Sequence, residues 1–289
     1  MEFSYETRIR VLMNKYDFHF DKSLGQNFLI DEDFLNRIVA GASPDKSDRI
    51  LEIGPGMGFL TEKLSAAAGS VTAVELDERL CSILNEAFAE EENVSVHHGD
   101  ALKMDFAALA AATAEKGFEK PFKIVANLPY YITTPLLFSF LDHRQYWSEM
   151  VIMVQKEVAE RVIASPGGKD YGVLTLMTAF DADAEILFEV PAAAFQPRPS
   201  VDSAVLRLVR RDAPPCPVAD KKVFRSMVKA GFGQRRKTLS NALKNSGVFR
   251  EKAEAGALLE RCGIDGRRRG ETLSFAEYAA LANAFVSEE

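Results

Sequence analysis

Several features are scarce in this chain of 289 residues, and each scarcity argues against a class of protein. The three cysteines, Cys81, Cys216 and Cys262, lie far apart and fit no zinc-ligand spacing, so we expect no metal site. Few, unpaired cysteines are typical of a reducing compartment, and we therefore expect a cytoplasmic protein. No apolar run is long enough to span a bilayer, and residues 1–10 do not resemble a secretion signal, so we expect no membrane partner.

Acidic residues are missing from one part of an otherwise acidic chain. The net charge is −7, yet residues 221–250 contain nine Lys or Arg and no Asp or Glu, which leaves −16 for the remainder. A solvated helix surface, the alternative interpretation, normally mixes both signs, whereas a long basic stretch is typical of a phosphate-binding face. The residues expected to contact nucleic acid are Lys222, Arg225, Lys229, Arg235, Arg236 and Lys237.

Three glycines follow a short apolar run near residue 50. Residues 50–53 (ILEI) predict a buried strand, Gly54, Gly56 and Gly58 break it, and a helical pattern begins at Phe59. Glycine lets a ligand approach the backbone closely, and a helix N-terminus offers free N–H groups. The pattern therefore favours a ligand-binding turn, although a tight turn that binds nothing has the same sequence signature.

Polar residues also follow the next three predicted strands. Residues 70–74 end at Glu75, which can accept hydrogen bonds from a ribose in either NAD or S-adenosylmethionine. Residues 93–98 are followed by Asp100, a candidate acceptor for an adenine amino group. Residues 122–126 are followed by Asn127-Leu128-Pro129-Tyr130. This last motif resembles the amino-methyltransferase signature, so the set favours S-adenosylmethionine.

The order of the predicted elements indicates the fold class. Strands and helices alternate from Arg49 to about Val209, which predicts an α/β, Rossmann-like sheet that is mostly parallel. The close spacing of residues 184–190 and 203–209 predicts a hairpin with an antiparallel last strand. No strand pattern follows Asp220, so we expect a small C-terminal all-α domain. The expected boundaries are an N-terminal extension at 1–21, a methyltransferase domain at 22–212, a linker at 213–219 and a helical RNA-binding domain at 220–289.

Longer motifs resemble one known family. The sequence resembles the KsgA-type small-subunit rRNA adenine dimethyltransferases over roughly residues 22–285. The stretches that carry the resemblance are KSLGQNFL at 22–29, LEIGPGMGFLT at 51–61, VELD at 74–77, GDAL at 99–102, NLPYYITTPLL at 127–137, VQKEVAERV at 154–162, FQPRPSVDSAVLRL at 195–208 and FGQRRKTLSNAL at 232–243.

The resemblance implies an enzyme that uses S-adenosylmethionine to dimethylate N6 of two adjacent adenosines. These lie in the 3′-terminal hairpin of 16S rRNA, within an immature 30S subunit, which links the activity to small-subunit biogenesis. By the same motifs, the cofactor contacts are Asn27, Leu29, Gly54, Gly56, Glu75, Asp100 and Asn127.

The adenine amine is a poor nucleophile, and the residues after the fourth strand are suited to activate it. The Asn127 side-chain oxygen and the Leu128 carbonyl can each accept one amine hydrogen, which orients the lone pair and stabilises the developing charge. Pro129 fixes the turn without adding an N–H group. Tyr130 offers a stacking face to an extruded base. Phe195 is the candidate for the opposite face, although core packing is the alternative interpretation of this residue and the more common one for a phenylalanine taken alone.

Two alternatives remain open at this point. One is an erythromycin-resistance-type enzyme that dimethylates large-subunit 23S rRNA. The other is a non-catalytic ribosome-assembly factor that keeps a methylase fold for binding. We expect a monomer, because the sequence shows no oligomerisation signature.

Overall fold

A computed structural model describes residues 4–21, 25–234, 236–249 and 252–287 of the protein. The chain divides into two compact units. Unit 1 comprises residues 1–159 and 185–210, and unit 2 comprises residues 160–184 and 211–289. Residues 160–184 therefore group with the C-terminal helices, although the sequence places them in the methyltransferase domain. The functions assigned to the domains stay predictions.

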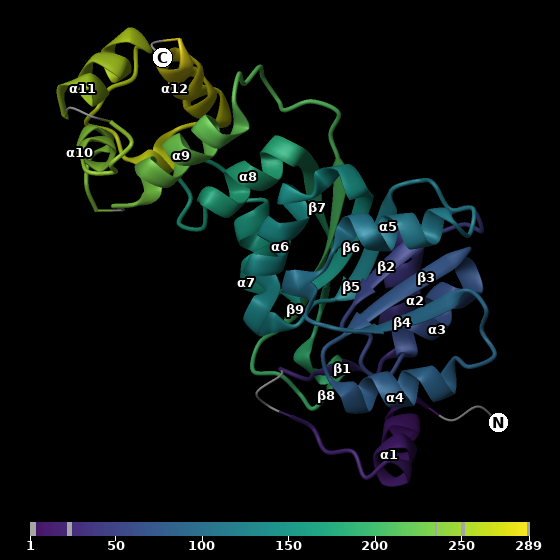
Figure 1. The fold of residues 1–289 in the computed structure, drawn as a ribbon. Helices are drawn as coiled ribbons and strands as arrows, with labels where there is room; N and C mark the ends of the chain where they lie inside the picture. Colours follow the sequence, from purple (N-terminus) through teal and green to yellow (C-terminus); the bar gives the residue numbers. More distant parts are fainter. Residues whose placement is uncertain (1–3, 22–24, 235, 250–251, 288–289) are drawn as a thin grey trace. The chain divides into compact units, whose positions relative to one another are not determined.

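Unit 1 is organised around a seven-stranded sheet (Figure 1). Its strands are β2 (Arg49–Ile53), β3 (Ser70–Glu75), β4 (Val94–His98), β5 (Phe122–Asn127), β6 (Trp147–Gln155), β7 (Ala182–Val190) and β9 (Ser203–Arg210). The strand order is β4-β3-β2-β5-β6-β9-β7. The pairs from β4 to β6 are parallel, and β9 runs antiparallel to β6. The predicted fold class is thereby confirmed, including the antiparallel strand near the end of the sheet.

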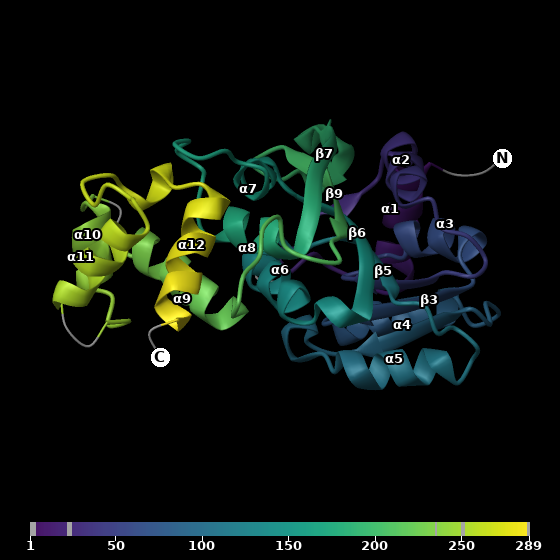
Figure 2. The ribbon, with the colours of Figure 1, turned by 90° about the horizontal axis from the view of Figure 1, so that it is seen from above.

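Helices cover both faces of this sheet. They are α1 (Tyr5–Lys15), α2 (Glu32–Ala42), α3 (Phe59–Ala67), α4 (Glu78–Ala87), α5 (Phe106–Ala114), α6 (Thr133–Asp142) and α7 (Lys156–Val162), the last of which ends in unit 2. Asp31, Asp77 and Asp105 begin three of them, because each side chain accepts a backbone N–H of the first turn. Figure 2 shows α2 and α5 on opposite faces, and the strands between them, such as β2 and β3, are buried on both sides.

A second, two-stranded sheet lies in segments for which the sequence predicts no strand. Strand β1 (Phe28–Leu29) pairs antiparallel with β8 (Phe195–Gln196), with Leu29 opposite Phe195. The side chains of Phe28 and Phe195 belong to the hydrophobic core. This pairing fixes the N-terminal loop of unit 1 beside the glycine-rich turn.

Unit 2 is helical and has its own aromatic core. Its helices are α8 (Val173–Asp181), α9 (Lys221–Phe232), α10 (Leu239–Lys244), α11 (Lys252–Arg261) and α12 (Phe275–Val286). The ring of Phe224 lies 5.2 Å from that of Phe180 and 4.8 Å from that of Phe275, measured between centroids. Ser274 and Glu277 form a capping box at the start of α12. No helix in the described part of the chain is long and apolar enough to cross a membrane.

Candidate active site

A cavity opens at the carboxyl ends of β2, β3, β4 and β5, the edge at which ligands bind in open parallel sheets. Its empty space is about 1020 Å³, counted out to the solvent at its mouth. The strand order brings residues from distant parts of the chain to this edge. The predicted site residues that line the cavity are Asn27, Leu29, Gly54, Gly56, Glu75, Asp100, Asn127, Leu128, Pro129 and Tyr130.

The glycine-rich turn leaves its backbone open to the cavity. Gly54 and Gly56 have φ values of +65° and +60°, which L side chains rarely adopt. A Cβ atom on Gly56 would lie 2.6 Å from the Phe28 ring, so the turn and the N-terminal loop are packed too closely for any side chain. The Gly54 and Gly58 N–H groups donate to the carbonyls of Val74 at 2.9 Å and Pro55 at 3.0 Å, so the turn offers a ligand close approach to its backbone and not the free N–H groups expected from the sequence.

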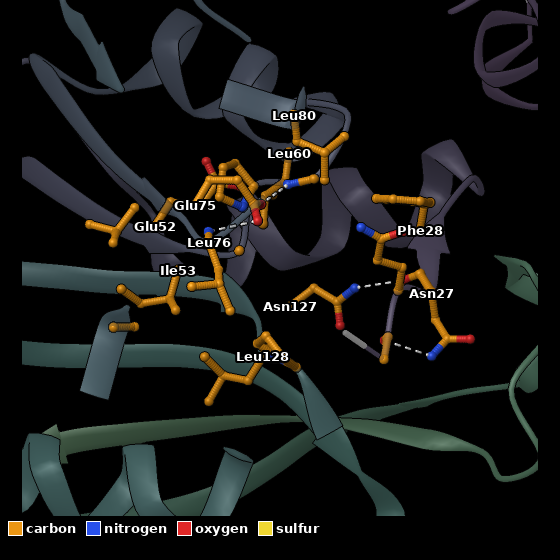
Figure 3. A pocket seen from close by; sticks show the side chains of 18 of the residues that line it. Asn27, Phe28, Glu52, Ile53, Leu60, Glu75, Leu76, Leu80, Asn127 and Leu128 are labelled. Atoms are coloured by element: carbon orange, nitrogen blue, oxygen red, sulfur yellow. Dashed lines mark hydrogen bonds between the residues drawn. The ribbon is translucent and has the colours of Figure 1, made fainter. Parts of the chain in front are cut away.

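Glu75 is held in place by the backbone around it. Its Oε1 accepts the N–H groups of Leu76 and Asp77 at 2.8 and 2.9 Å, and its Oε2 accepts that of Gly56 at 3.2 Å (Figure 3). Burial raises the pKa of the Glu75 carboxyl, and these backbone hydrogen bonds act in the opposite direction. A carboxylate has about four lone-pair sites, so with three of them occupied Glu75 can still accept a ribose hydroxyl on Oε2.

Glu52, which the sequence did not single out as a site residue, also lines the cavity. Its side chain is buried, and one oxygen accepts the Thr61 hydroxyl at 2.7 Å. Burial raises the pKa of the Glu52 carboxyl to about 8, and the charge of Glu75 adds to the rise. The signal available in the sequence was an acidic residue inside the apolar run of β2.

Asn127 lies at the end of β5 with its amide oriented by a neighbour. Its Nδ2 donates to the Asn27 carbonyl at 3.1 Å, and the Asn27 Nδ2 donates in turn to the Gly25 carbonyl at 3.0 Å (Figure 3). The Leu128 N–H donates to the Met153 carbonyl of β6 at 3.0 Å. With Nδ2 engaged in this way, Oδ1 of Asn127 is the polar atom available to accept a hydrogen bond from a substrate.

Two tyrosines follow Pro129, and the structure distinguishes them. The Tyr130 hydroxyl lies 2.5 Å from the Ser203 Oγ, and burial raises the pKa of its phenol. Tyr131 also lines the cavity but is 49% exposed, and its ring lies 3.2 Å from the position of a Cβ on Gly25. Tyr130 is therefore fixed inside the cavity, whereas Tyr131 lies at its margin.

Asp100 and Phe195 differ in how the structure places them. Asp100 lines the cavity and caps the short helix at residues 101–103, with the Leu102 N–H donating to it at 2.9 Å. Phe195 does not line the cavity, because β8 directs its ring into the core, where it is 2% exposed. This placement does not support the predicted stacking of Phe195 on a base.

The predicted basic residues lie in unit 2. Lys222, Arg225 and Lys229 are three and four residues apart on α9, a spacing that places them on one helix face. Phe224, which is buried, lies on another face of the helix. Arg236 and Lys237 are exposed in the turn that follows α9, and Arg235 lies outside the described residues.

Comparisons with known proteins agree on one family. A family model described as ribosomal RNA adenine dimethylase matches residues 17–285. The chain is 47% identical over 283 residues to the ribosomal RNA small subunit methyltransferase A of Geobacillus kaustophilus. The aligned region covers 96% of this chain and 95% of that protein. It is 45% identical over 281 residues to the protein of the same name from Bacillus mycoides, with 96% of each chain covered.

Two solved structures are similar along most of their length. A dimethyladenosine transferase from Plasmodium falciparum has a TM-score of 0.76 and 26% identity, covering 89% of this chain and 97% of the other. The 23S rRNA methyltransferase ErmE has a TM-score of 0.65 and 27% identity, covering 89% and 98%.

Proposed function

The chain belongs to the ribosomal RNA adenine dimethylase family, and from this premise we propose that it dimethylates N6 of two adjacent adenosines in 16S rRNA, using S-adenosylmethionine. The observation that carries the proposal is the turn Asn127–Tyr130, which meets the glycine-rich turn, Glu75 and Asp100 in one cavity. Those groups match the parts of an adenosine cofactor and of an adenine substrate. The substrate we propose is the immature 30S subunit.

The comparisons favour the small subunit over the large one. The relatives named as small-subunit methyltransferases share 45–47% identity with this chain over 96% of its length. ErmE, named as a 23S rRNA methyltransferase, shares 27% identity and a lower TM-score than the dimethyladenosine transferase. A non-catalytic assembly factor would not require the acceptor groups of Asn127 and Leu128 at the cavity.

The cavity fits S-adenosylmethionine by the chemistry of its donor set. The left-handed glycines bring backbone without Cβ atoms to the cavity, and Glu75 presents a buried carboxylate suited to a ribose. Asp100 can accept from the adenine amino group, and Asn27 and Asn127 form one hydrogen-bonded unit at the other side of the cavity. When bound, the cofactor supplies an electrophilic methyl group on a sulfonium sulfur. The leaving group is a neutral thioether, so its departure needs no acid.

The task of the protein is then to orient and activate the adenine amine. We assign the two acceptors to Asn127 Oδ1 and the Leu128 carbonyl, each taking one amine hydrogen, so that the lone pair faces the methyl group. These dipoles are already in place and stabilise the positive charge that develops on N6. Pro129 adds no competing donor, and Tyr130 provides the stacking face for the extruded base.

A direct test of this function is methyl transfer from labelled S-adenosylmethionine to two substrates. These are small subunits that lack the modification and protein-free 23S rRNA, with products identified by nuclease digestion and mass spectrometry. We expect dimethyladenosine in the small subunit alone. Label in 23S rRNA would instead identify the protein as an enzyme that methylates the large-subunit rRNA. Cofactor binding without label in either substrate would favour the assembly-factor alternative.

Gly56→Ala is expected to raise the dissociation constant for S-adenosylmethionine at least about tenfold. The new methyl group strains a left-handed backbone and meets the Phe28 ring, so the turn must shift away from the cavity. Gly117→Ala is the matched control, because Gly117 has φ +90° with no atom within 4 Å of its Cβ position. Isothermal titration calorimetry measures the affinity of both variants for S-adenosylmethionine. Gly117→Ala shows the effect of backbone strain alone, and Gly56→Ala adds the displacement of the turn. If the two variants bind the cofactor equally well, this role for Gly56 is contradicted.

Replacing Lys222 and Lys229 of α9 together by alanine is expected to weaken binding of small-subunit rRNA and to flatten its salt dependence. Loss of two phosphate contacts lowers the slope of log K against log salt by about 1.5. Lys116→Ala, which removes an exposed lysine of unit 1, should leave the slope unchanged. An unchanged slope in the double variant would contradict the basic-face proposal.

A further inference from the structure

We propose that Ser203 is a positioning residue that fixes the ring of Tyr130, the stacking face for the target adenine, by holding its hydroxyl group. This inference rests on the proposed function. It adds to the proposed active site a residue from the second segment of unit 1, residues 185–210. Ser203 belongs to the stretch FQPRPSVDSAVLRL, whose role in the chemistry the proposed function leaves open.

The hydrogen bond that carries the inference joins two distant parts of the chain. The Ser203 Oγ and the Tyr130 hydroxyl are 2.5 Å apart, and the two residues are separated by 73 positions. Ser203 is 0% exposed, so water does not compete for its hydroxyl. A short bond at a dry site constrains the tilt of a ring more effectively than one at the surface.

Ser203 is itself held rigidly, which makes it a fixed reference point. It begins β9 and lies opposite Gln155 at the end of β6. The preceding residue, Asp202, accepts the Lys156 N–H on its carbonyl at 3.0 Å and the Ala192 N–H on its Oδ1 at 2.8 Å. Three segments of unit 1 therefore determine where the Ser203 hydroxyl lies, and through it where the Tyr130 ring lies.

Tyr130 needs such an anchor because of its place in the chain. It opens a short 3-10 turn at Tyr130–Ile132, directly after Pro129, and it is one of the residues that line the cavity. Its raised pKa keeps the phenol protonated at neutral pH, so the hydroxyl acts as a hydrogen-bonding group and not as a base. When the Tyr130 ring tilts, an adenine stacked on it tilts too, and its N6 atom moves. The rate of methyl transfer depends steeply on the position of N6.

The test compares Ser203→Ala, Tyr130→Phe and the double variant in the full chain, with unmethylated small subunits as substrate. Each single variant is expected to lower kcat about fivefold, the ratio typical of one lost neutral hydrogen bond. The double variant should be no slower than either single variant, because both remove the same bond. The dissociation constant for S-adenosylmethionine should stay within about twofold of wild type. A 2-aminopurine at the target position should show a changed fluorescence quench in all three variants.

Ser148→Ala is the matched control. Ser148 also lies on the sheet, in β6, and its hydroxyl donates to the Phe122 carbonyl at 3.4 Å, but it does not line the cavity. We expect it to keep wild-type kcat and quench, even where its melting temperature falls. A Ser203→Ala protein that loses Tm but keeps kcat would overturn the inference.

Other outcomes also decide the question. If Ser203→Ala does not fold, Tyr130→Phe carries the test, because it keeps the ring and opens no cavity in the core; an unchanged kcat there overturns the inference. Losses that multiply in the double variant, to about 25-fold, would show that the two hydroxyls act separately and would overturn it as well. A wild-type protein that transfers no methyl group would overturn the proposed function first, and the inference with it.

Discussion

Asn127→Ala is expected to slow methyl transfer to small subunits by about a hundredfold or more at saturating cofactor. The substitution removes Oδ1, one of the two proposed acceptors for the adenine amine, and the loss of one preorganised group of this kind costs about that much in kcat. It also removes the Nδ2 bond to the Asn27 carbonyl, so the N-terminal loop loses one tie to the end of β5. Single-turnover rates with labelled cofactor measure the chemical step directly.

Asn93→Ala is the matched control for this prediction. Its side chain also donates Nδ2 to a backbone carbonyl, that of Ser65 at 2.8 Å, but it does not line the cavity. We expect this variant to lose some thermal stability and to keep the wild-type rate. If Asn127→Ala methylates as fast as Asn93→Ala, Asn127 is not the acceptor and the catalytic assignment must be withdrawn.

Glu52→Gln is expected to stabilise the cofactor-free protein, and by more at high pH than at low pH. The carboxyl of an unfolded chain loses its proton near its ordinary pKa of 4.5, whereas the buried Glu52 holds its proton up to a pKa of about 8. Between these pH values the folded state binds one proton more than the unfolded state, so the free energy of unfolding falls as the pH rises. Glutamine keeps an acceptor for the Thr61 hydroxyl and has no proton to lose.

Urea denaturation at pH 5, 6, 7 and 8 measures the effect. The difference in unfolding free energy between Glu52→Gln and wild type should grow by about 1.4 kcal/mol per pH unit between pH 6 and 7, and by less towards pH 8, where the folded carboxyl begins to lose its own proton. Other titrating groups are common to both proteins and cancel in the difference. Glu90→Gln, at an exposed position, should show a difference that does not change with pH. A constant difference for Glu52→Gln as well would mean that Glu52 is ionised in the folded state.

The sequence predicted those parts of the structure that are determined by residues close together in the chain. The strand before Gly54 and the strands that end at Glu75 and Asn127 are confirmed, because apolar β-branched runs and their polar ends are local signals. Once the sheet is parallel, its topology brings these ends to one edge, so the cavity lining followed from the strand assignments. The helix starts at Asp31 and Ser274 also depend on local signals, because each capping side chain accepts an N–H group from the first turn.

Features that depend on distant residues could not be predicted in this way. Strands of two residues, such as β1 and β8, carry no periodicity, so their pairing was not visible in the sequence, and the choice between core packing and base stacking for Phe195 depended on it. The bond between Tyr130 and Ser203 joins residues that only the antiparallel placement of β9 brings together. Glu52 has an apolar neighbour on each side in the chain, and its environment depends on Thr61 of the next helix.

The discontinuous make-up of unit 2 restricts how its parts can be exchanged between relatives. Helix α8, which precedes β7 and β9 in the chain, contributes Phe180 to the aromatic core and Asp181 to an ion pair with Lys221 at 2.6 Å. A chimera joined at the proline-rich segment near residue 215 would combine the C-terminal helices of one protein with the α8 of another. Their shared core would then be mismatched at Phe224 and Lys221. Recombination that preserves unit 2 therefore needs junctions at 159/160, 184/185 and 210/211, which move α8 together with the helices it packs against.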